Sequence, residues 1–185
     1  IVKKFISEKI KDFEKNFESF IEKINVITDA QSDQYSFSLK NKFDTDKIKE
    51  TDVVRLISDA KQQIIRNNKD SSILHLIVDK YIVDGQEYFE FPENVNYKEF
   101  VVEVSFITIQ NTIIKTLNKI FEDCNIEVKK IISHQYSSRF AEKTDTSPCI
   151  AGKKVVDGIN PSEVIMYNLY SKKQGFFEKM FNFFS

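Results

Sequence analysis

Apolar residues recur at helical spacing near the start of the chain, and this pattern predicts a helix over residues 3–25. Lysine and glutamate fill the gaps between the apolar positions, which follow one another at intervals of four and three: Ile6, Ile10, Phe13, Phe17, Phe20 and Ile24. Such a face either packs on a neighbouring domain surface or pairs with a second copy. Thr28–Gln34 is the first polar break, and Tyr35–Leu39 then alternates like a short strand.

The middle of the chain carries two further helical patterns and three strand patterns. The first helix is expected from about Lys47 to Asn67, and its apolar face is formed by Val53, Leu56, Ile57, Ala60, Ile64 and Ile65. The second is expected over Asn111–Asp123, with Asn125 placed to end it in a left-handed conformation. The strand patterns lie at 73–86, 100–109 and 127–133. This order predicts an α+β fold, a small antiparallel sheet with flanking helices.

The pattern weakens beyond Ser138. Residues 141–163 hold two of the three prolines and two of the four glycines of the chain, with little periodicity. We therefore expect an irregular linker over 141–171.

The last stretch, KKQGFFEKMFNFFS (172–185), predicts an amphipathic helix. On a helical projection its apolar side chains cover an arc of about 160°. That face consists of Phe176, Phe177, Met180, Phe181, Phe183 and Phe184, and three lysines accompany it, Lys172, Lys173 and Lys179. Bulky aromatic residues with lysines at the boundary are typical of helices that bind a membrane surface. The alternative is that this face docks on the protein's own sheet or on a partner.

Composition narrows the class of protein. With 185 residues and 41% hydrophobic residues, the chain is the size of one domain, or of one domain with appendages, and has enough apolar side chains for a core. The net charge is −1 and the lysines alternate with acidic residues, which argues against nucleic-acid binding. We expect no membrane-spanning helix, because no run of about 18 apolar residues occurs. Two cysteines make no disulfide framework and favour a reducing cytosol.

Little in the sequence indicates catalysis. His75 lies inside an apolar strand pattern, where a structural histidine is expected, and Cys124 belongs to the apolar face of its helix. Cys149 has no basic or histidine neighbour to activate it. Gly152-Lys153-Lys154 has only a superficial likeness to a phosphate loop. We therefore expect no enzyme activity, no metal and no cofactor.

The order of elements over 47–140 resembles the inserted subdomain of FtsA, the actin-like bacterial cell-division protein. Four stretches carry the resemblance: TDVVRLISDAK (51–61), ILHLIVDKYIVDGQE (73–87), FVVEVSFITI (100–109) and IQNTIIKTLNKIFEDCNIEVKKII (109–132). Residues 1–46 look more loosely like a remnant of the actin-like core. The final KKQGFFEKMFNFF (172–184) is similar to the membrane-targeting helix of that family.

The resemblance implies a function. In that family the protein tethers FtsZ filaments to the inner membrane and self-polymerises. Carried over, the six apolar tail residues insert into the bilayer and the three lysines meet anionic headgroups. The phosphate-binding strands of the actin-like cleft have no counterpart in 141–171. The resemblance therefore favours membrane attachment and assembly over ATP binding.

We thus expect a reduced or partial FtsA-like protein, a peripheral scaffold on the cytoplasmic face of the bacterial inner membrane. Its expected partners are an anionic membrane surface, division proteins such as FtsZ and other copies of itself. Two alternatives remain open. The chain is a fragment of an ATP-binding actin-like ATPase, or it is a soluble adaptor whose tail binds a protein groove.

Overall fold

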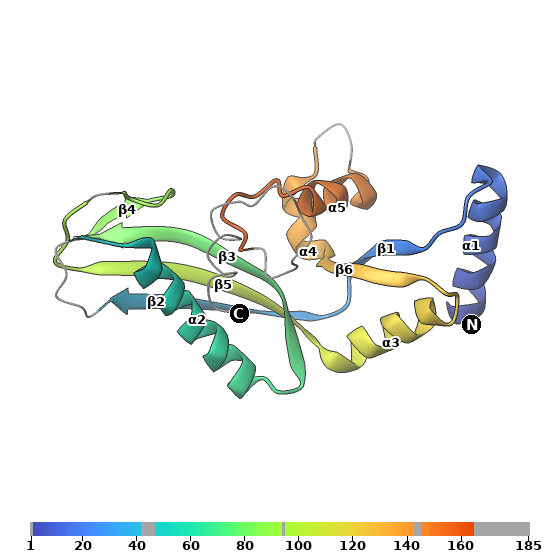
Figure 1. Ribbon diagram of the computed structural model, residues 1–185, viewed down its shortest axis with the longest axis horizontal. Helices are drawn as coiled ribbons and strands as arrows, with labels where there is room; N and C mark the ends of the chain where they lie inside the picture. Colours follow the sequence, from blue (N-terminus) through green and yellow to red (C-terminus); the bar gives the residue numbers. More distant parts are fainter. Residues whose placement is uncertain (1, 42–46, 94, 143–145, 165–185) are drawn as a thin grey trace. The chain divides into compact units, whose positions relative to one another are not determined.

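The chain forms two compact units, each assembled from two separate stretches of sequence. The computed structural model describes residues 2–41, 47–93, 95–142 and 146–164 (Figure 1). One unit combines residues 1–30 with 110–157, and the other combines 31–109 with the chain from 158 onward. We call them the two-strand unit and the four-strand unit after their sheets.

The four-strand unit is an antiparallel sheet with one helix packed on it. The sheet has the order β2-β5-β3-β4, and the helix is α2. The bounds are β2 Ser32–Asn41, α2 Glu50–Asn67, β3 Ser71–Val83, β4 Gln86–Tyr88 and β5 Phe100–Gln110. The edge strand β2 pairs with β5 in an unbroken antiparallel register, from Ser32 opposite Ile109 to Asn41 opposite Phe100. These elements confirm the α+β prediction.

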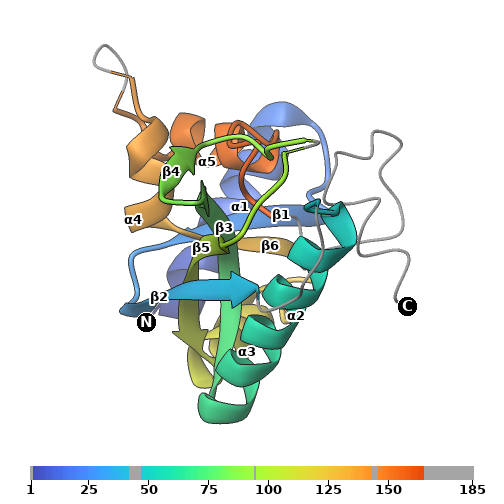
Figure 2. The ribbon, with the colours of Figure 1, turned by 90° about the vertical axis from the view of Figure 1, so that its left-hand side faces the viewer.

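The core of this unit lies between α2 and one face of the sheet (Figures 1 and 2). The helix contributes Val53, Val54, Ile57, Ala60 and Ile64, and the strands contribute Leu76, Val78, Tyr81, Val102, Val104 and Phe106, all buried. The predicted apolar face of α2 is therefore largely the buried one. Ile65, predicted on that face, is exposed, because the buried face of the helix includes Val54 and not Ile65.

Two local signals set the ends of these elements. Asp52 in the first turn of α2 accepts a hydrogen bond from the Lys49 backbone N–H, so an acidic side chain satisfies an N–H left free at the helix start. Asp84 and Gly85 both have positive φ angles, 49° and 86°, as the tight hairpin between β3 and β4 requires. The Asp84 carboxylate also accepts from the backbone of Glu99, at 2.7 Å. The predicted turn is confirmed.

The two-strand unit is built around a parallel pair, β1 (Lys23–Thr28) and β6 (Glu127–Ser133). The remaining elements are α1 Val2–Phe17, α3 Asn111–Glu122, α4 His134–Ser137, a 3-10 turn at Ser138–Phe140 and α5 Pro148–Val156. Gly152 of α5 faces Ile27 so closely that a Cβ atom there would lie 2.3 Å from the isoleucine Cδ1. The missing side chain lets α5 approach β1 closely.

The prediction of a helix over 3–25 is wrong at its C-terminal end. α1 ends at Phe17, and Glu18 takes a left-handed conformation with φ 50°. Ile24, expected on the helix face, lies in β1. The apolar period continues past Phe17, but KINVIT is rich in β-branched residues and pairs with β6. Tertiary pairing has overridden the local period.

Two further expectations are corrected. The strand at 127–133 exists, but it does not complete the antiparallel sheet, because it pairs in parallel with β1. The segment 141–171, predicted to be irregular, contains the helix α5. Pro148 stands at the start of that helix, where its missing N–H costs nothing, and Ala151, Gly152 and Val155 form its buried face. The proline and glycine there therefore serve a helix and not a linker.

We predict that Tyr81 makes the four-strand unit less stable at high pH. Burial, with a smaller effect of the Glu50 carboxylate, raises the pKa of Tyr81 from 10.0 to about 12. The native state therefore keeps a proton that the unfolded chain loses near pH 10. The stabilisation is complete below pH 10 and is lost as the pH rises toward 12.

The free energy of unfolding of the wild type should fall by up to about 1.4 kcal/mol per pH unit in this range. Tyr81→Phe should not show this fall, so by pH 11 it should lose roughly 1 kcal/mol less than the wild type. Urea unfolding at pH 9, 10 and 11 measures it. Tyr88→Phe on β4, where the ring is only half-buried, is the matched control. Parallel pH slopes for the wild type and Tyr81→Phe would contradict the prediction.

Candidate functional site

The predicted membrane-binding residues lie outside the described residues. This holds for the whole set: Lys172, Lys173, Phe176, Phe177, Lys179, Met180, Phe181, Phe183 and Phe184. The described chain ends at Val164, shortly before them. Its last residues form the structure that connects the four-strand unit to this tail. We call residues 158–164 the latch segment.

The latch segment adds to β3 through main-chain hydrogen bonds. The Val78 N–H donates to the Ser162 carbonyl at 2.9 Å, and the Val164 N–H donates to the Leu76 carbonyl at 2.8 Å. They flank an antiparallel bridge between Ile77 and Glu163. β3 also pairs with β4 over Tyr81–Val83, so two short segments pair with successive stretches of this strand. The latch segment is thus part of the sheet.

Side chains reinforce this pairing. Val164 is buried and belongs to the same hydrophobic cluster as Leu76 and Val78. Glu163 is buried as well, and its Oε1 lies 2.8 Å from Nδ1 of the buried His75. A carboxylate and an imidazole removed from water need such a partner, because each would otherwise lose its hydration without compensation. The pair therefore ties the latch segment to β3 in one register.

His75 is buried in a strand, as predicted. The sequence does not predict its partner, Glu163, because this residue follows Asn160-Pro161-Ser162, a stretch typical of a solvated turn. The separation of 88 residues gives sequence reasoning no way to join the two. The one available signal was a histidine within an apolar run, which requires a polar partner somewhere in the fold.

Polar side chains join three strands of the same sheet. The buried Ser105 hydroxyl on β5 donates to Asp79 Oδ2 on β3 at 2.6 Å and lies 3.2 Å from the Ser36 hydroxyl on β2. Beside them Lys80 pairs with Glu87 at 2.5 Å, and this hydrogen bond is the main reason that the pKa of Lys80 is raised. These contacts fix the relative register of the strands and give this surface both signs of charge.

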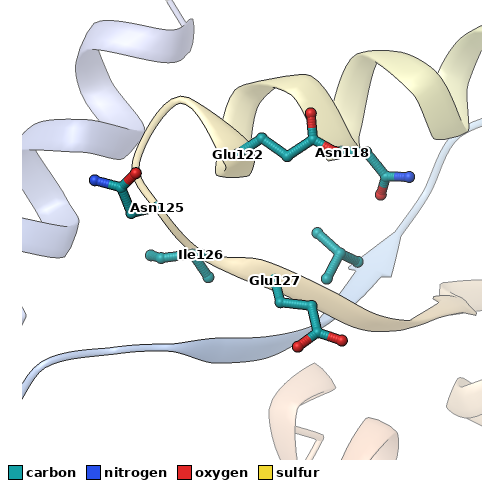
Figure 3. Close-up of a pocket in the computed structure, with 6 residues that line it drawn as sticks. Asn118, Glu122, Asn125, Ile126 and Glu127 are labelled. Atoms are coloured by element: carbon teal, nitrogen blue, oxygen red, sulfur yellow. The ribbon is translucent and has the colours of Figure 1, made fainter.

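A pocket of about 340 Å³ lies in the two-strand unit between α3 and β6. It is lined by Asn118, Glu122, Asn125, Ile126, Glu127 and Val128. Figure 3 shows Asn118 and Glu122 on the helix and Glu127 on the strand, with Asn125 in the connection. Asn125 has φ 61°, which confirms the predicted left-handed helix end. The lining offers amide and carboxylate oxygens beside the apolar side chains of Ile126 and Val128.

The helix α1 carries an exposed row of aromatic residues. We call Phe5, Phe13, Phe17 and the following Phe20 the aromatic strip. Their exposed fractions are 58%, 47%, 65% and 87%. Phe13 and Phe17 stack with ring centroids 4.3 Å apart. A row of large exposed rings is uncommon on a protein surface, so we treat the strip as a candidate interaction site.

The two cysteines differ in exposure, since Cys124 is half-buried and Cys149 is exposed. Among the described residues, no helix is both long enough and apolar enough to cross a bilayer.

The comparisons with known proteins agree with the fold. Residues 29–108 match the family model of the SHS2 domain inserted in FtsA. A segment of 112 residues is 29% identical to the cell division protein FtsA of Buchnera aphidicola subsp. Schizaphis graminum. The match covers 60% of this chain and 26% of that relative. The resemblance to FtsA is confirmed, and residues 29–108 form an FtsA-like cell-division domain, which corresponds closely to the four-strand unit.

We predict that the latch segment depends on Glu163. Glu163→Ala leaves His75 buried without that carboxylate and should lower the free energy of unfolding by about 2–4 kcal/mol. Glu163→Gln keeps a hydrogen-bonding oxygen and should cost about 1 kcal/mol. The exchange of the Val78 amide hydrogen, bonded to Ser162, should accelerate in Glu163→Ala.

The exposed Glu93 supplies a matched control, because Glu93→Ala removes the same side chain from the same unit. Chemical unfolding and hydrogen exchange measure both effects. Equal losses for Glu163→Ala and Glu93→Ala would show that the buried pair contributes nothing specific.

Proposed function

We propose that this chain, which carries an FtsA-like domain over residues 29–108, acts as an FtsA-like cell-division protein that attaches to a membrane surface through residues 172–185. In this function it is a scaffold on the cytoplasmic face of the inner membrane. It holds the four-strand unit close to the bilayer and recruits division proteins such as FtsZ, or further copies of itself. The match to the FtsA domain supports the cell-division part of the proposal.

The latch segment is the observation that carries the tethering part. It ends at Val164, and the predicted amphipathic helix starts at Lys172. Eight residue steps of extended chain span at most about 30 Å. A tail bound to the membrane would therefore keep the sheet within about that distance of the headgroups. The buried His75–Glu163 pair makes the latch segment, which leads to the tail, part of the folded four-strand unit.

The tail supplies the chemistry for the bilayer. Each phenylalanine buried among lipid chains contributes roughly 1.5–3 kcal/mol, and each lysine near an anionic surface contributes about 1 kcal/mol. A short helix of this kind binds reversibly. Several copies held together would bind far more tightly, because each later contact is made at high local concentration. Membrane attachment and self-association would thus support each other.

The same proposal assigns no catalysis to this chain. Gly152-Lys153-Lys154 lies inside the helix α5 and not in a loop before a helix. Gly152 is packed against Ile27, so this glycine serves helix–strand packing and not the approach of a phosphate. This arrangement argues against that stretch as part of a nucleotide site.

We predict that the tail face determines membrane binding. In the full chain, Phe177→Asp with Phe181→Asp should lower partitioning onto vesicles of mixed neutral and anionic lipids at least tenfold, since two charges then face the hydrocarbon. Truncation after Gln174 should act the same way. Raising the salt concentration should weaken binding of the wild type.

Co-sedimentation with the vesicles measures this prediction. Phe89→Asp changes an exposed phenylalanine of the four-strand unit and is the matched control. Equal partitioning of the wild type, the tail variant and the truncated chain would end the membrane proposal. Binding of a protein partner, lost in the tail variant, would then favour the soluble adaptor.

We also expect that ATP with Mg²⁺ does not stabilise this chain against thermal unfolding. A ligand present at 100 times its dissociation constant would add about 2.7 kcal/mol, which a thermal melt detects easily. A shift of the melting temperature that follows the ATP concentration would support the fragment of an actin-like ATPase instead.

A further inference from the structure

Two polar contacts lie near the ends of α1, and neither involves a ring of the aromatic strip. At the start of the helix Lys3 pairs with Asp123, and this contact is the main reason that the pKa of the Asp123 carboxyl is lowered. At its end Glu14 Oε1 accepts from the Ile21 N–H at 3.0 Å. The rings of the aromatic strip are exposed, although Ile6 and Ile10 on the same helix are half-buried.

The strip continues through a charged residue. Phe5, Lys9, Phe13 and Phe17 follow one another at intervals of four, so they form one row along the helix. Lys9 Nζ lies 5.8 Å from the centre of the Phe5 ring and 3.7 Å from Asp12 Oδ2. The row thus combines three rings, a cation that already contacts an aromatic face and a carboxylate at its border.

We propose that a second copy of this chain covers the strip, with the two α1 helices packed antiparallel. The row is complementary to itself in that orientation. Its middle falls at residue 11, so Phe5 of each copy faces Phe17 of the other, and Lys9 faces Phe13. Lys9 also lies beside Asp12 of the other copy, which exchanges ion pairs within each helix for ion pairs between the helices. This pairing assigns a surface to the self-association that is part of the proposed function. The inference rests on the proposed function only for that self-association.

Charge favours a second copy over a lipid surface as the occupant. Glu8 and Asp12 border the strip on its solvent side, and both are exposed. α1 also carries five lysines, so both signs of charge surround the apolar rings, and mixed charges around an apolar centre are typical of protein interfaces. Antiparallel pairing meets the Asp12 charge with Lys9.

A charge exchange between two variants of the full chain tests the inference. Lys9→Asp alone and Asp12→Lys alone should each weaken dimerisation at least tenfold, because each places like charges across the interface. An equimolar mixture of the two variants should restore the dimer, since the carboxylate introduced in one copy then meets the ammonium group introduced in the other. Phe13→Ser with Phe17→Ser should weaken the dimer about 100-fold, without lowering the melting temperature of a helix face that is already exposed.

Sedimentation velocity without vesicles measures the single variants, and capture of an untagged variant by a tagged one measures the mixture. The same series in the background of Phe177→Asp and Phe181→Asp removes any association through the tail. Phe89→Ser is the control for loss of an exposed ring. Recovery in the mixture supports the inference, whatever the outcome of the vesicle experiment.

Three results would overturn it. One is a wild type that stays monomeric at a concentration about 100 times a dissociation constant in the micromolar range. Another is a dimer that the α1 variants leave unchanged. The third is loss of vesicle binding in Phe13→Ser with Phe17→Ser but no change in association, which would assign the strip to lipid.

Discussion

The burial of β3 is the constraint on which the four-strand unit depends. This strand is the longest in the sheet, and one side of it presents Leu76 and Val78 to the core under α2. Such a strand is stable only when its main-chain N–H and C=O groups are paired on both edges, because a buried peptide group without a partner costs more than a hydrogen bond returns. β5, β4 and the latch segment share that task. The hairpin at Asp84-Gly85 supplies β4 locally, but the latch segment comes from far along the chain.

The latch segment ties the sheet of the four-strand unit to a distant part of the chain. The chain after residue 157 leaves the two-strand unit and returns to the sheet of the other unit. The buried His75–Glu163 pair fixes its register, because a shift by one residue would move the carboxylate to the opposite face of the strand. Whatever follows Val164 is therefore connected to a folded sheet by a short segment. A surface contact made by the tail would act on the FtsA-like domain directly.

The two kinds of apolar surface in this chain would serve the proposed scaffold differently. The rings of the aromatic strip lie exposed on and just after a regular helix, so they form a surface with helical spacing that a partner of matching shape would fit. The tail pattern, by contrast, has a broad aromatic arc with lysines, and a fluid bilayer accepts such a face without shape complementarity. The proposed scaffold would use the first surface for assembly with a second copy and the second for attachment to a membrane. The FtsA-like domain stands between them in the chain, at residues 29–108.

The sequence by itself determined the elements whose signals are local. The period of α2, the alternation in β2, the Asp84-Gly85 turn and the left-handed Asn125 all depend on neighbours within a few residues, and all are present as predicted. Only the tertiary structure decided that α1 stops at Phe17, that β6 joins β1 in parallel and that Glu163 reaches His75. Each depends on a contact between residues distant in sequence, and the periodicity of one segment gives no information about such a partner. The candidate site divides in the same way. The sequence placed a buried histidine in a strand and an apolar face with Phe13 and Phe17 on a helix, but the fold decided which carboxylate meets that histidine and which rings stay exposed.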